Sequence, residues 1–328
     1  MRVAVLGGGR SGEHAVSLAS AAAVREGLEA AGHSALAVEI TREGRWRHED
    51  VELTLTPAGG LLDCDVAFPA LHGPYGEDGV VQGVLECLDI PYVGSDIASS
   101  ALCIDKVRSK QALGGAGIPQ VDYRAVEHRT FAQAPERVAD ELVPLGLPVF
   151  VKPARMGSSV GIAKVTDAGD ALVAALAAAF EHDERAIVEA SARGLEVECS
   201  LLGNRELRTS PPGEIVLHSD FYDYAAKYEP NGMELVVPAR ISPAARAAVQ
   251  RLAVEAFELC GCAGLARADF FVDGEQVLLN ELNTMPGFTA TSVYAKLWQA
   301  DGLAYASLVD ELCRLGIERH ARTRSYVP

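Results

Sequence analysis

The chain is poor in positive charge, with 29 lysine and arginine residues against 45 aspartate and glutamate residues and a formal net charge of −16. No stretch of the sequence is rich in lysine or arginine. Nucleic acids and anionic membranes bind mainly to clusters of basic side chains, so we expect neither as the main partner. A few cations concentrated at one place can still bind a small anionic ligand.

The sequence also lacks a long hydrophobic run and a paired cysteine motif. The most apolar predicted helix, residues 171–180, is far shorter than the roughly 20 residues that cross a bilayer. The seven cysteines are scattered, odd in number and without a C-x-x-C pair, which indicates buried free thiols rather than a disulfide framework. Because no secretory signal precedes the first predicted strand, we expect a cytoplasmic protein.

The order of predicted elements indicates an α/β protein of three units. With 328 residues, 49% of them hydrophobic, the chain is long enough for two or three compact domains. Short apolar strands first alternate with helices, which is typical of a doubly wound parallel sheet. A helix is then expected over residues 99–116, and later segments mix helices with strands that carry polar insertions. We predict units at residues 1–95, 96–190 and 191–328.

A glycine-rich loop, GGGRSG at residues 7–12, follows the first predicted strand. It matches the G-x-G-x-x-G loop of dinucleotide-binding folds, in which Glu39 would contact a ribose. Glu13 opposes this interpretation, because a carboxylate in the first helical turn takes the place that a pyrophosphate needs. Glu13 suits an ammonium-bearing ligand instead, or is only a favourable helix charge. The loop at residues 71–79 adds His72, which either contacts the same ligand or caps the turn.

A second glycine-rich loop, residues 153–161, follows a predicted strand that carries Lys152. Backbone N–H groups of such a loop can hold phosphate oxygens, and the lysine can reach them. The order differs from that of a Walker A loop, in which the lysine follows the glycines. The segment therefore indicates a phosphate site of another kind, or else an ordinary flexible hairpin.

Two predicted strands, residues 266–272 and 277–283, form an acidic hairpin. Residues two apart lie on the same face of a strand, and Asp269, Glu281 and Asn283 offer oxygen atoms of the kind that bind Mg²⁺ shared with phosphates. The alternative is a solvated hairpin whose charges have no special role.

The register of this hairpin decides whether its acidic side chains meet. A two-residue turn at residues 273–274 would place Asp269 opposite Leu278. We therefore predict a longer or bulged connection that brings Asp269 beside Glu281. After the hairpin, Gly287 lets the backbone approach a ligand closely, and its N–H can stabilise an oxyanion.

Seven blocks of sequence, in this order, resemble the D-alanine–D-alanine ligases of the ATP-grasp superfamily. They extend from residue 7 to residue 292 and read GGGRSGEHAVS, ALHGPYGEDG, DKVRSK, VKPARMGSSVG, FYDYAAKY, ARADFF and ELNTMPGFTATS. The resemblance implies the ATP-grasp architecture, an N-terminal doubly wound parallel-sheet domain followed by two α+β lobes that enclose the nucleotide. It also implies a homodimer.

The resemblance implies roles for the matching positions. Glu13 and His72 would hold the ammonium group of the first D-alanine, and Ser292 would bind the carboxylate of the second. The residues implied in ATP binding are Lys106, Lys152, Ser159, Glu189, Glu196 and Lys227. Two Mg²⁺ or Mn²⁺ ions would be carried by Asp269, Glu281 and Asn283. The other implied catalytic residues are Ser158 and Tyr228, which link with Glu13, and Arg267 and Gly287, which stabilise the tetrahedral intermediate.

The implied activity is the ATP-dependent joining of two D-alanines for peptidoglycan precursors, through an acyl phosphate and with release of ADP and phosphate. Because an acyl phosphate must be kept from water, we expect a lid at residues 220–230. Tyr228 favours an amine as second substrate. The alternative is a related ligase that takes D-lactate, D-serine or another amino acid. A monovalent cation is a further partner that the resemblance allows.

Overall fold

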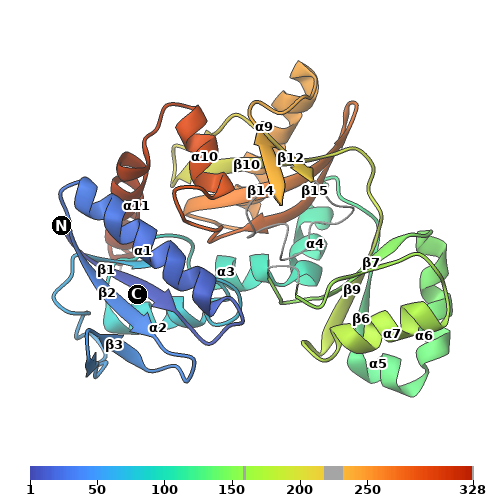
Figure 1. Cartoon of the computed structure of the whole chain (residues 1–328), viewed down its shortest axis with the longest axis horizontal. Helices are drawn as coiled ribbons and strands as arrows, with labels where there is room; N and C mark the ends of the chain where they lie inside the picture. The colour runs from blue at the N-terminus through green and yellow to red at the C-terminus, as the bar shows by residue number, and fades with distance from the viewer. Residues whose placement is uncertain (158–159, 218–231, 327–328) are drawn as a thin grey trace.

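The computed structural model describes residues 1–157, 160–217 and 232–326, and three sheets lie within them. Figure 1 shows the N-terminal sheet in blue at one end of the molecule and the central sheet in green at the other. The C-terminal sheet, in yellow and orange, lies between them. The unit boundaries at residues 95 and 190 stay a prediction.

The N-terminal sheet has a parallel centre and an antiparallel edge. Its elements are β1 (Arg2–Gly8), α1 (His14–Ala30), β2 (Ser34–Ile40), β3 (Trp46–His48), β4 (Val51–Glu52), β5 (Val66–Pro69) and α2 (Val80–Leu88). The strand order is β4-β3-β2-β1-β5. The pairs β1–β2 and β1–β5 are parallel, as the alternation of strands and helices predicts. The edge strands β3 and β4 were not expected; they follow β2 through short loops and therefore pair antiparallel.

Two consecutive helices, α3 (Ile97–Ile104) and α4 (Lys106–Gly115), connect the N-terminal sheet to the central one. The expectation of a single helix over residues 99–116 is wrong. The Asp105 carboxylate accepts hydrogen bonds at 3.1 and 3.0 Å from two backbone N–H groups of α4, and so caps a new helix. This cap places Lys106 in the first turn of α4.

The central sheet is antiparallel in all its pairs. Its elements are β6 (Tyr123–Glu127), α5 (His128–Gln133), α6 (Pro135–Leu142), the 3₁₀ turn η1 (Val143–Leu145), β7 (Val149–Pro153), β8 (Ala163–Val165), α7 (Asp170–Ala179) and β9 (Arg185–Ala190). The strand order is β6-β9-β7-β8. Phe150 pairs with Glu189, so Lys152, two residues further along β7, lies on the same face of the sheet as Glu189.

The C-terminal sheet carries the acidic hairpin. Its elements are β10 (Leu195–Gly203), β11 (Arg208–Thr209), β12 (Gly213–Leu217), β13 (Met233–Val236), α9 (Pro243–Leu259), β14 (Gly264–Asp273) and β15 (Gln276–Asn283). The order is β13-β12-β10-β14-β15, with β11 on β10. Near the turn Val272 pairs with Val277, but a register shift after Asp269 brings that residue opposite Glu281. The predicted bulge is confirmed.

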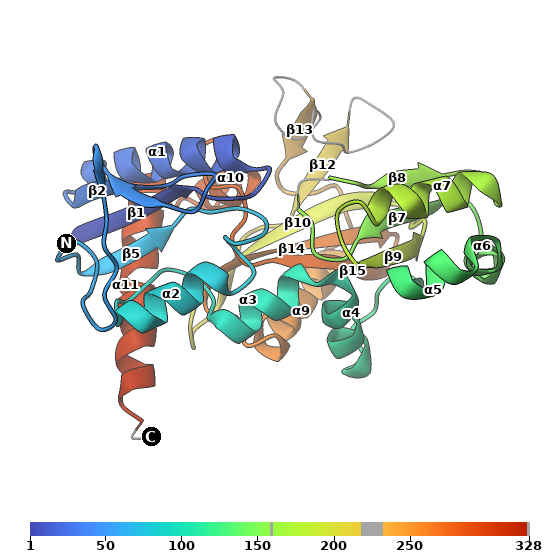
Figure 2. The same cartoon turned by 90° about the horizontal axis from the view of Figure 1, so that it is seen from below.

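The chain returns to its N-terminal unit through α10 (Val293–Ala300) and α11 (Tyr305–Arg324). Figure 2 shows α11 running past the end of the N-terminal sheet. One buried core combines residues of β1, α1 and β5 with residues of α10 and α11. Phe288, just before α10, is fully buried and packs edge-on against Phe68 of β5, with ring centroids 5.3 Å apart. The last segment of the chain therefore covers the first sheet.

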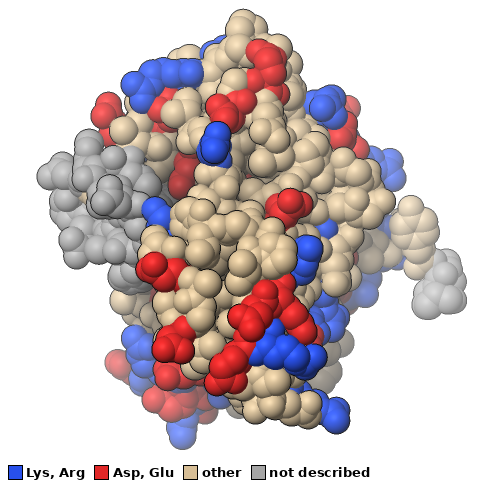
Figure 3. Space-filling view, turned by 90° about the vertical axis from the view of Figure 1, so that its right-hand side faces the viewer, with Lys and Arg blue, Asp and Glu red and all other residues tan. Residues whose placement is uncertain are grey.

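Charged side chains of both signs are mixed on the surface. On the face shown in Figure 3, lysine and arginine side chains lie interspersed with aspartate and glutamate wherever the residues are coloured. Such mixing gives little net attraction for a polyanion. None of the helices described here is both long enough and apolar enough to span a bilayer.

Replacing Phe288 by alanine should destabilise the protein by about 3–5 kcal/mol, because it leaves a cavity between the N-terminal sheet and the C-terminal helices. Urea unfolding followed by circular dichroism measures the change. Leu259→Ala is the matched control, since that side chain is 52% exposed at the end of α9. Equal free energies of unfolding for the two variants would show that this junction contributes no stability.

Candidate active site

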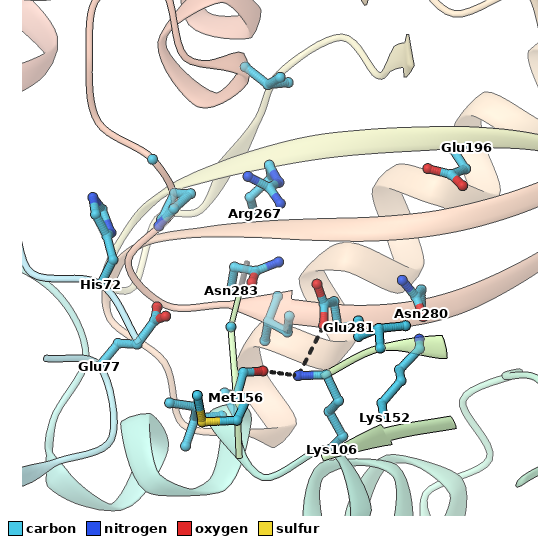
Figure 4. A pocket seen from close by; sticks show the side chains of 18 of the residues that line it. His72, Glu77, Lys106, Lys152, Met156, Glu196, Arg267, Asn280, Glu281 and Asn283 are labelled. Atoms are coloured by element: carbon cyan, nitrogen blue, oxygen red, sulfur yellow. Dashed lines mark hydrogen bonds and ion pairs between the residues drawn. The ribbon is translucent and has the colours of Figure 1, made fainter. Parts of the chain in front are cut away.

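One cavity of about 790 Å³ lies where the three sheets meet. Its lining includes Glu13 from the N-terminal unit, Lys106 and Lys152 from the central unit, and Arg267 and Glu281 from the C-terminal hairpin. Figure 4 shows Lys106, Lys152 and Glu281 directed into this shared space. The lysines and the acidic hairpin therefore act on the same cavity, as one nucleotide-binding site requires.

Glu13 lies where the two glycine-rich loops approach each other. It precedes the first turn of α1 and is only 6% exposed. A Cβ added at Gly157 would stand 2.7 Å from the Glu13 Oε2 atom, and one added at Gly73 would meet the same oxygen. Both glycines thus make room for this carboxylate. The place that a pyrophosphate would take in a dinucleotide-binding fold is occupied by Glu13.

His72 is held by protein groups on both sides of its ring. Its Nε2 lies 2.8 Å from the Ser20 hydroxyl and its Nδ1 lies 3.2 Å from the Met285 carbonyl oxygen. Burial lowers the pKa of His72, although Glu13 nearby opposes the shift. A neutral ring that donates through Nδ1 and accepts through Nε2 fits these neighbours. His72 lines the cavity, but contact with an ammonium group would require one of these bonds to be replaced.

Glu77 is a site residue that the sequence analysis missed. It lines the cavity, and its Oε1 accepts a hydrogen bond from the Gly73 N–H at 2.9 Å. Burial, reinforced by Glu13, raises the pKa of Glu77 to about 8. An available signal was the position of this carboxylate in a glycine-rich loop just after a buried strand. With this raised pKa, the Glu77 carboxyl group retains its proton near neutral pH.

Two lysines of the central unit reach the cavity, each with a fixed partner. Lys106 Nζ donates to the Met156 carbonyl oxygen at 2.8 Å and lies 3.7 Å from Glu281 Oε2 (Figure 4). Lys152 Nζ lies 2.5 Å from Glu189 Oε2. Glu189 also lines the cavity, but its side chain is 3% exposed and forms ion pairs with Lys110 and Lys152. Its predicted side-chain contact with the nucleotide therefore has no direct support in this geometry.

The acidic hairpin presents oxygen donors next to a bidentate ion pair. Arg267 donates to both Asp269 oxygens at 2.7 Å and lies 2.8 Å from Glu198 Oε2. Asn283 Nδ2 donates to Asp269 at 3.0 Å. Among the residues placed by the structure, no group of three or more His, Cys, Asp or Glu side chains forms a metal site by itself. Hard oxygen donors on adjacent strands still fit a divalent cation that takes its other ligands from phosphates and water.

The segment after the hairpin closes one side of the cavity. Ser292 stands at the N-terminus of α10, where its Oγ accepts a hydrogen bond from the Thr289 N–H at 3.0 Å. Gly287 lies against Ser292, whose Oγ would be 3.3 Å from an added Cβ. Glu196 of β10 contributes to the opposite part of the lining. Four predicted site residues, Ser158, Ser159, Lys227 and Tyr228, lie outside the described residues, as does the predicted lid at 220–230.

Two family models match the chain. The D-ala D-ala ligase N-terminus matches residues 2–59 and 52–95, and the D-ala D-ala ligase C-terminus matches residues 112–314. Together they cover most of the chain, including all three sheets.

Individual relatives extend the match over nearly the full length. The D-alanine–D-alanine ligase of Deinococcus radiodurans is 44% identical, with 97% of this chain and 98% of the relative covered. D-alanine–D-alanine ligase A of Escherichia coli K12 is 39% identical, with 98% and 97% covered.

Two solved structures share the architecture. One, of the D-alanine–D-alanine ligase from Coxiella burnetii, matches with a TM-score of 0.89 and 34% identity over 99% of this chain and 96% of that one. The other, of the VanG D-Ala:D-Ser ligase from Enterococcus faecalis, matches with a TM-score of 0.84 and 35% identity over 96% and 99%. The predicted ATP-grasp architecture is confirmed, and the chain belongs to the D-alanine–D-alanine ligase family.

Proposed function

We propose that this protein joins two D-alanines at the expense of ATP, through an acyl phosphate, and so supplies D-alanyl-D-alanine for peptidoglycan. The observation that carries the proposal is the single cavity in which Glu13, Lys152 and Glu281 meet. Glu13 precedes α1 beside the N-terminal sheet, Lys152 lies on β7 of the central sheet and Glu281 lies on β15 of the C-terminal sheet. Each has the charge that one part of the reaction needs. The family implies ATP and a divalent metal.

The nucleotide phosphates would lie between the lysines and the acidic hairpin. Lys106 and Lys152 offer ammonium groups to the phosphate oxygens. Asp269, Glu281 and Asn283 would hold Mg²⁺ or Mn²⁺, which supplies positive charge against the phosphates when it is bound. Both kinds of phosphate ligand would then come from the lining of the same cavity, with Lys106 next to Glu281.

The first D-alanine would lie at the junction of the two glycine-rich loops. Its ammonium group would face Glu13 and Glu77, both of which line the cavity. Its carboxylate would then point toward the phosphates and become the acyl phosphate. Positioning of this kind supplies much of the rate enhancement in phosphoryl transfer.

The second D-alanine would approach from the side of α10. The Ser292 hydroxyl and the N-terminus of α10 offer donors to its carboxylate. Arg267 and the Gly287 N–H lie on the way to the acyl carbon, where they would stabilise the oxyanion of the tetrahedral intermediate. A cytoplasmic location and a homodimer belong to the same proposal.

A second candidate function is the ligation of D-alanine to a different acceptor. The likeness to a D-Ala:D-Ser ligase at 35% identity favours it. The part of the chain that would discriminate between the two includes Tyr228, which lies outside the described residues.

Incubation with ATP, magnesium chloride and D-alanine should yield D-alanyl-D-alanine with one phosphate released per dipeptide. Mass spectrometry identifies the product, and a phosphate assay gives the rate. Parallel reactions with an equal mixture of D-alanine and D-serine, or D-alanine and D-lactate, test the acceptor. A mixed product formed in excess over D-alanyl-D-alanine would favour the second candidate, and phosphate release without any dipeptide or depsipeptide would refute both.

Gly157→Ala should reduce kcat/KM for D-alanine by about 100-fold or more, because the new Cβ displaces the Glu13 carboxylate and a misplacement near 1 Å has effects of that order. Gly115→Ala is the matched control, since it has no atom within 4 Å of the added Cβ and ends the ordinary helix α4. We expect this control to keep the wild-type kcat/KM. Equal kcat/KM values for the two variants would contradict the proposed role of Glu13 in binding D-alanine.

Glu77→Gln should change how stability depends on pH in the ligand-free protein. Because burial raises the pKa of Glu77 from 4.5 to about 8, the folded state holds a proton that the unfolded state has lost between these values. The free energy of unfolding therefore falls as the pH rises from about 4.5 to 8. Glu77→Gln does not lose stability in this way. As the pH rises from about 4.5 to 8, the variant should therefore become more stable relative to the wild type. A constant difference between pH 5 and 8.5 in urea titrations would contradict the prediction.

A further inference from the structure

A buried carboxylate stands between two lysines at the back of the cavity. Glu189 of β9 is 2% exposed, and its Oε1 lies 3.1 Å from Lys110 Nζ while its Oε2 lies 2.5 Å from Lys152 Nζ. Lys152 opens on the cavity, whereas Lys110 of α4 is 3% exposed and does not line it. Lys110 therefore acts on the nucleotide site through its ion pair with Glu189 and not by direct contact with a ligand.

The charge of this trio depends on Lys110. Glu189 and Lys152 alone sum to zero, and Lys110 restores one positive charge. Screening by water and salt is weak for buried groups, so this balance acts at short range on a nearby phosphate. Burial opposes ionisation of Glu189, but Lys152 and Lys110 overcome it and lower its pKa to about 2. Burial also lowers the pKa of Lys110, although the neighbouring Glu189 carboxylate opposes that shift.

The backbone fixes each member of the trio from a different side. Glu189 and Lys152 share a face of the central sheet through the pairing of β7 with β9. Lys110 is carried by α4, whose start is set by the Asp105 cap. The Lys110 carbonyl oxygen accepts a hydrogen bond from Gln120 Nε2 at 2.7 Å, and the Tyr123 ring lies 5.9 Å from its ammonium. This arrangement leaves Glu189 little freedom to move toward Lys152 alone.

We infer that Lys110 is a positioning residue for nucleotide binding: it shares the Glu189 carboxylate and so keeps the Lys152 ammonium available to a phosphate. This inference rests on the proposed function, in which Lys152 contacts ATP. Without Lys110, the Glu189 carboxylate, already 2.5 Å from Lys152 Nζ, offsets the charge of Lys152 alone, and the pair presents no net positive charge to a phosphate. An ion pair with a purely structural role would instead affect folding and leave nucleotide affinity unchanged in the folded protein.

Lys110→Met should raise the dissociation constant for ADP with magnesium chloride by at least about tenfold, measured by isothermal titration calorimetry, because one partner of a buried charge group is lost. In steady-state assays the KM for ATP should rise similarly, while kcat and the KM for D-alanine change by less than about threefold. Lys110→Arg keeps the charge and should stay close to the wild type.

The double variant Lys110→Met with Glu189→Gln restores the single positive charge on Lys152. Its dissociation constant for ADP should lie within about threefold of that of Glu189→Gln alone, because Lys110 acts through the carboxylate that both variants lack. Lys110→Gln takes the place of Lys110→Met in this comparison where the latter fails to fold.

Unchanged ADP affinity in Lys110→Met, or an equal effect of this substitution in the wild type and in Glu189→Gln, would overturn the inference while leaving the proposed function intact. This outcome is recognised when the wild type forms D-alanyl-D-alanine and the Lys110 variants bind ADP as the wild type does. A wild-type protein that binds no ADP at all would instead refute the proposed function, and the inference with it.

Discussion

Opposite charges buried around one cavity are the constraint on which the rest of the structure depends. Lys106 meets Glu281, Lys152 meets Glu189, and Arg267 meets Asp269, all with partly or largely buried side chains. A buried charge without its partner is strongly destabilising. The Lys152–Glu189 pair lies within the central sheet and the Arg267–Asp269 pair within β14. The Lys106–Glu281 pair joins α4 to β15, so its charges are compensated only when the central unit docks correctly on the C-terminal hairpin. The chain has a net charge of −16, and the same ion pairs hold lysine and arginine side chains at the cavity, where they can bind an anionic ligand.

Local pattern was enough to predict several parts of this arrangement. The alternation of side chains along two strands predicted a bulge, and the bulge does bring Asp269 beside Glu281. The order of strand, glycine-rich loop and helix also predicted that Glu13 and Lys152 serve ligands, and both residues line the cavity. Such predictions can be made from sequence because they depend on residues close together in the chain.

Residues whose role depends on distant partners could not be found in this way. Glu77 is distinguished by the burial and the Glu13 carboxylate that raise its pKa, and Lys110 by a contact with a strand about 80 residues away along the chain. The helix break at Asp105 is an intermediate case, since an aspartate is a common cap but also occurs within helices. The sequence left His72 either as a ligand contact or as a cap of its turn; the structure places it at the cavity with both ring nitrogens next to protein groups.

The packing of the final helices has a consequence for how the protein is made. Core positions of the first sheet are completed by α10 and α11, which end at residue 324. A ribosome translates the N-terminal strands long before these helices emerge, and nascent domains generally fold as they are synthesised. The first sheet must therefore wait with an uncovered apolar face until synthesis is nearly complete. A chain truncated before residue 293 would keep the acidic hairpin yet leave that face open to chaperones or to aggregation.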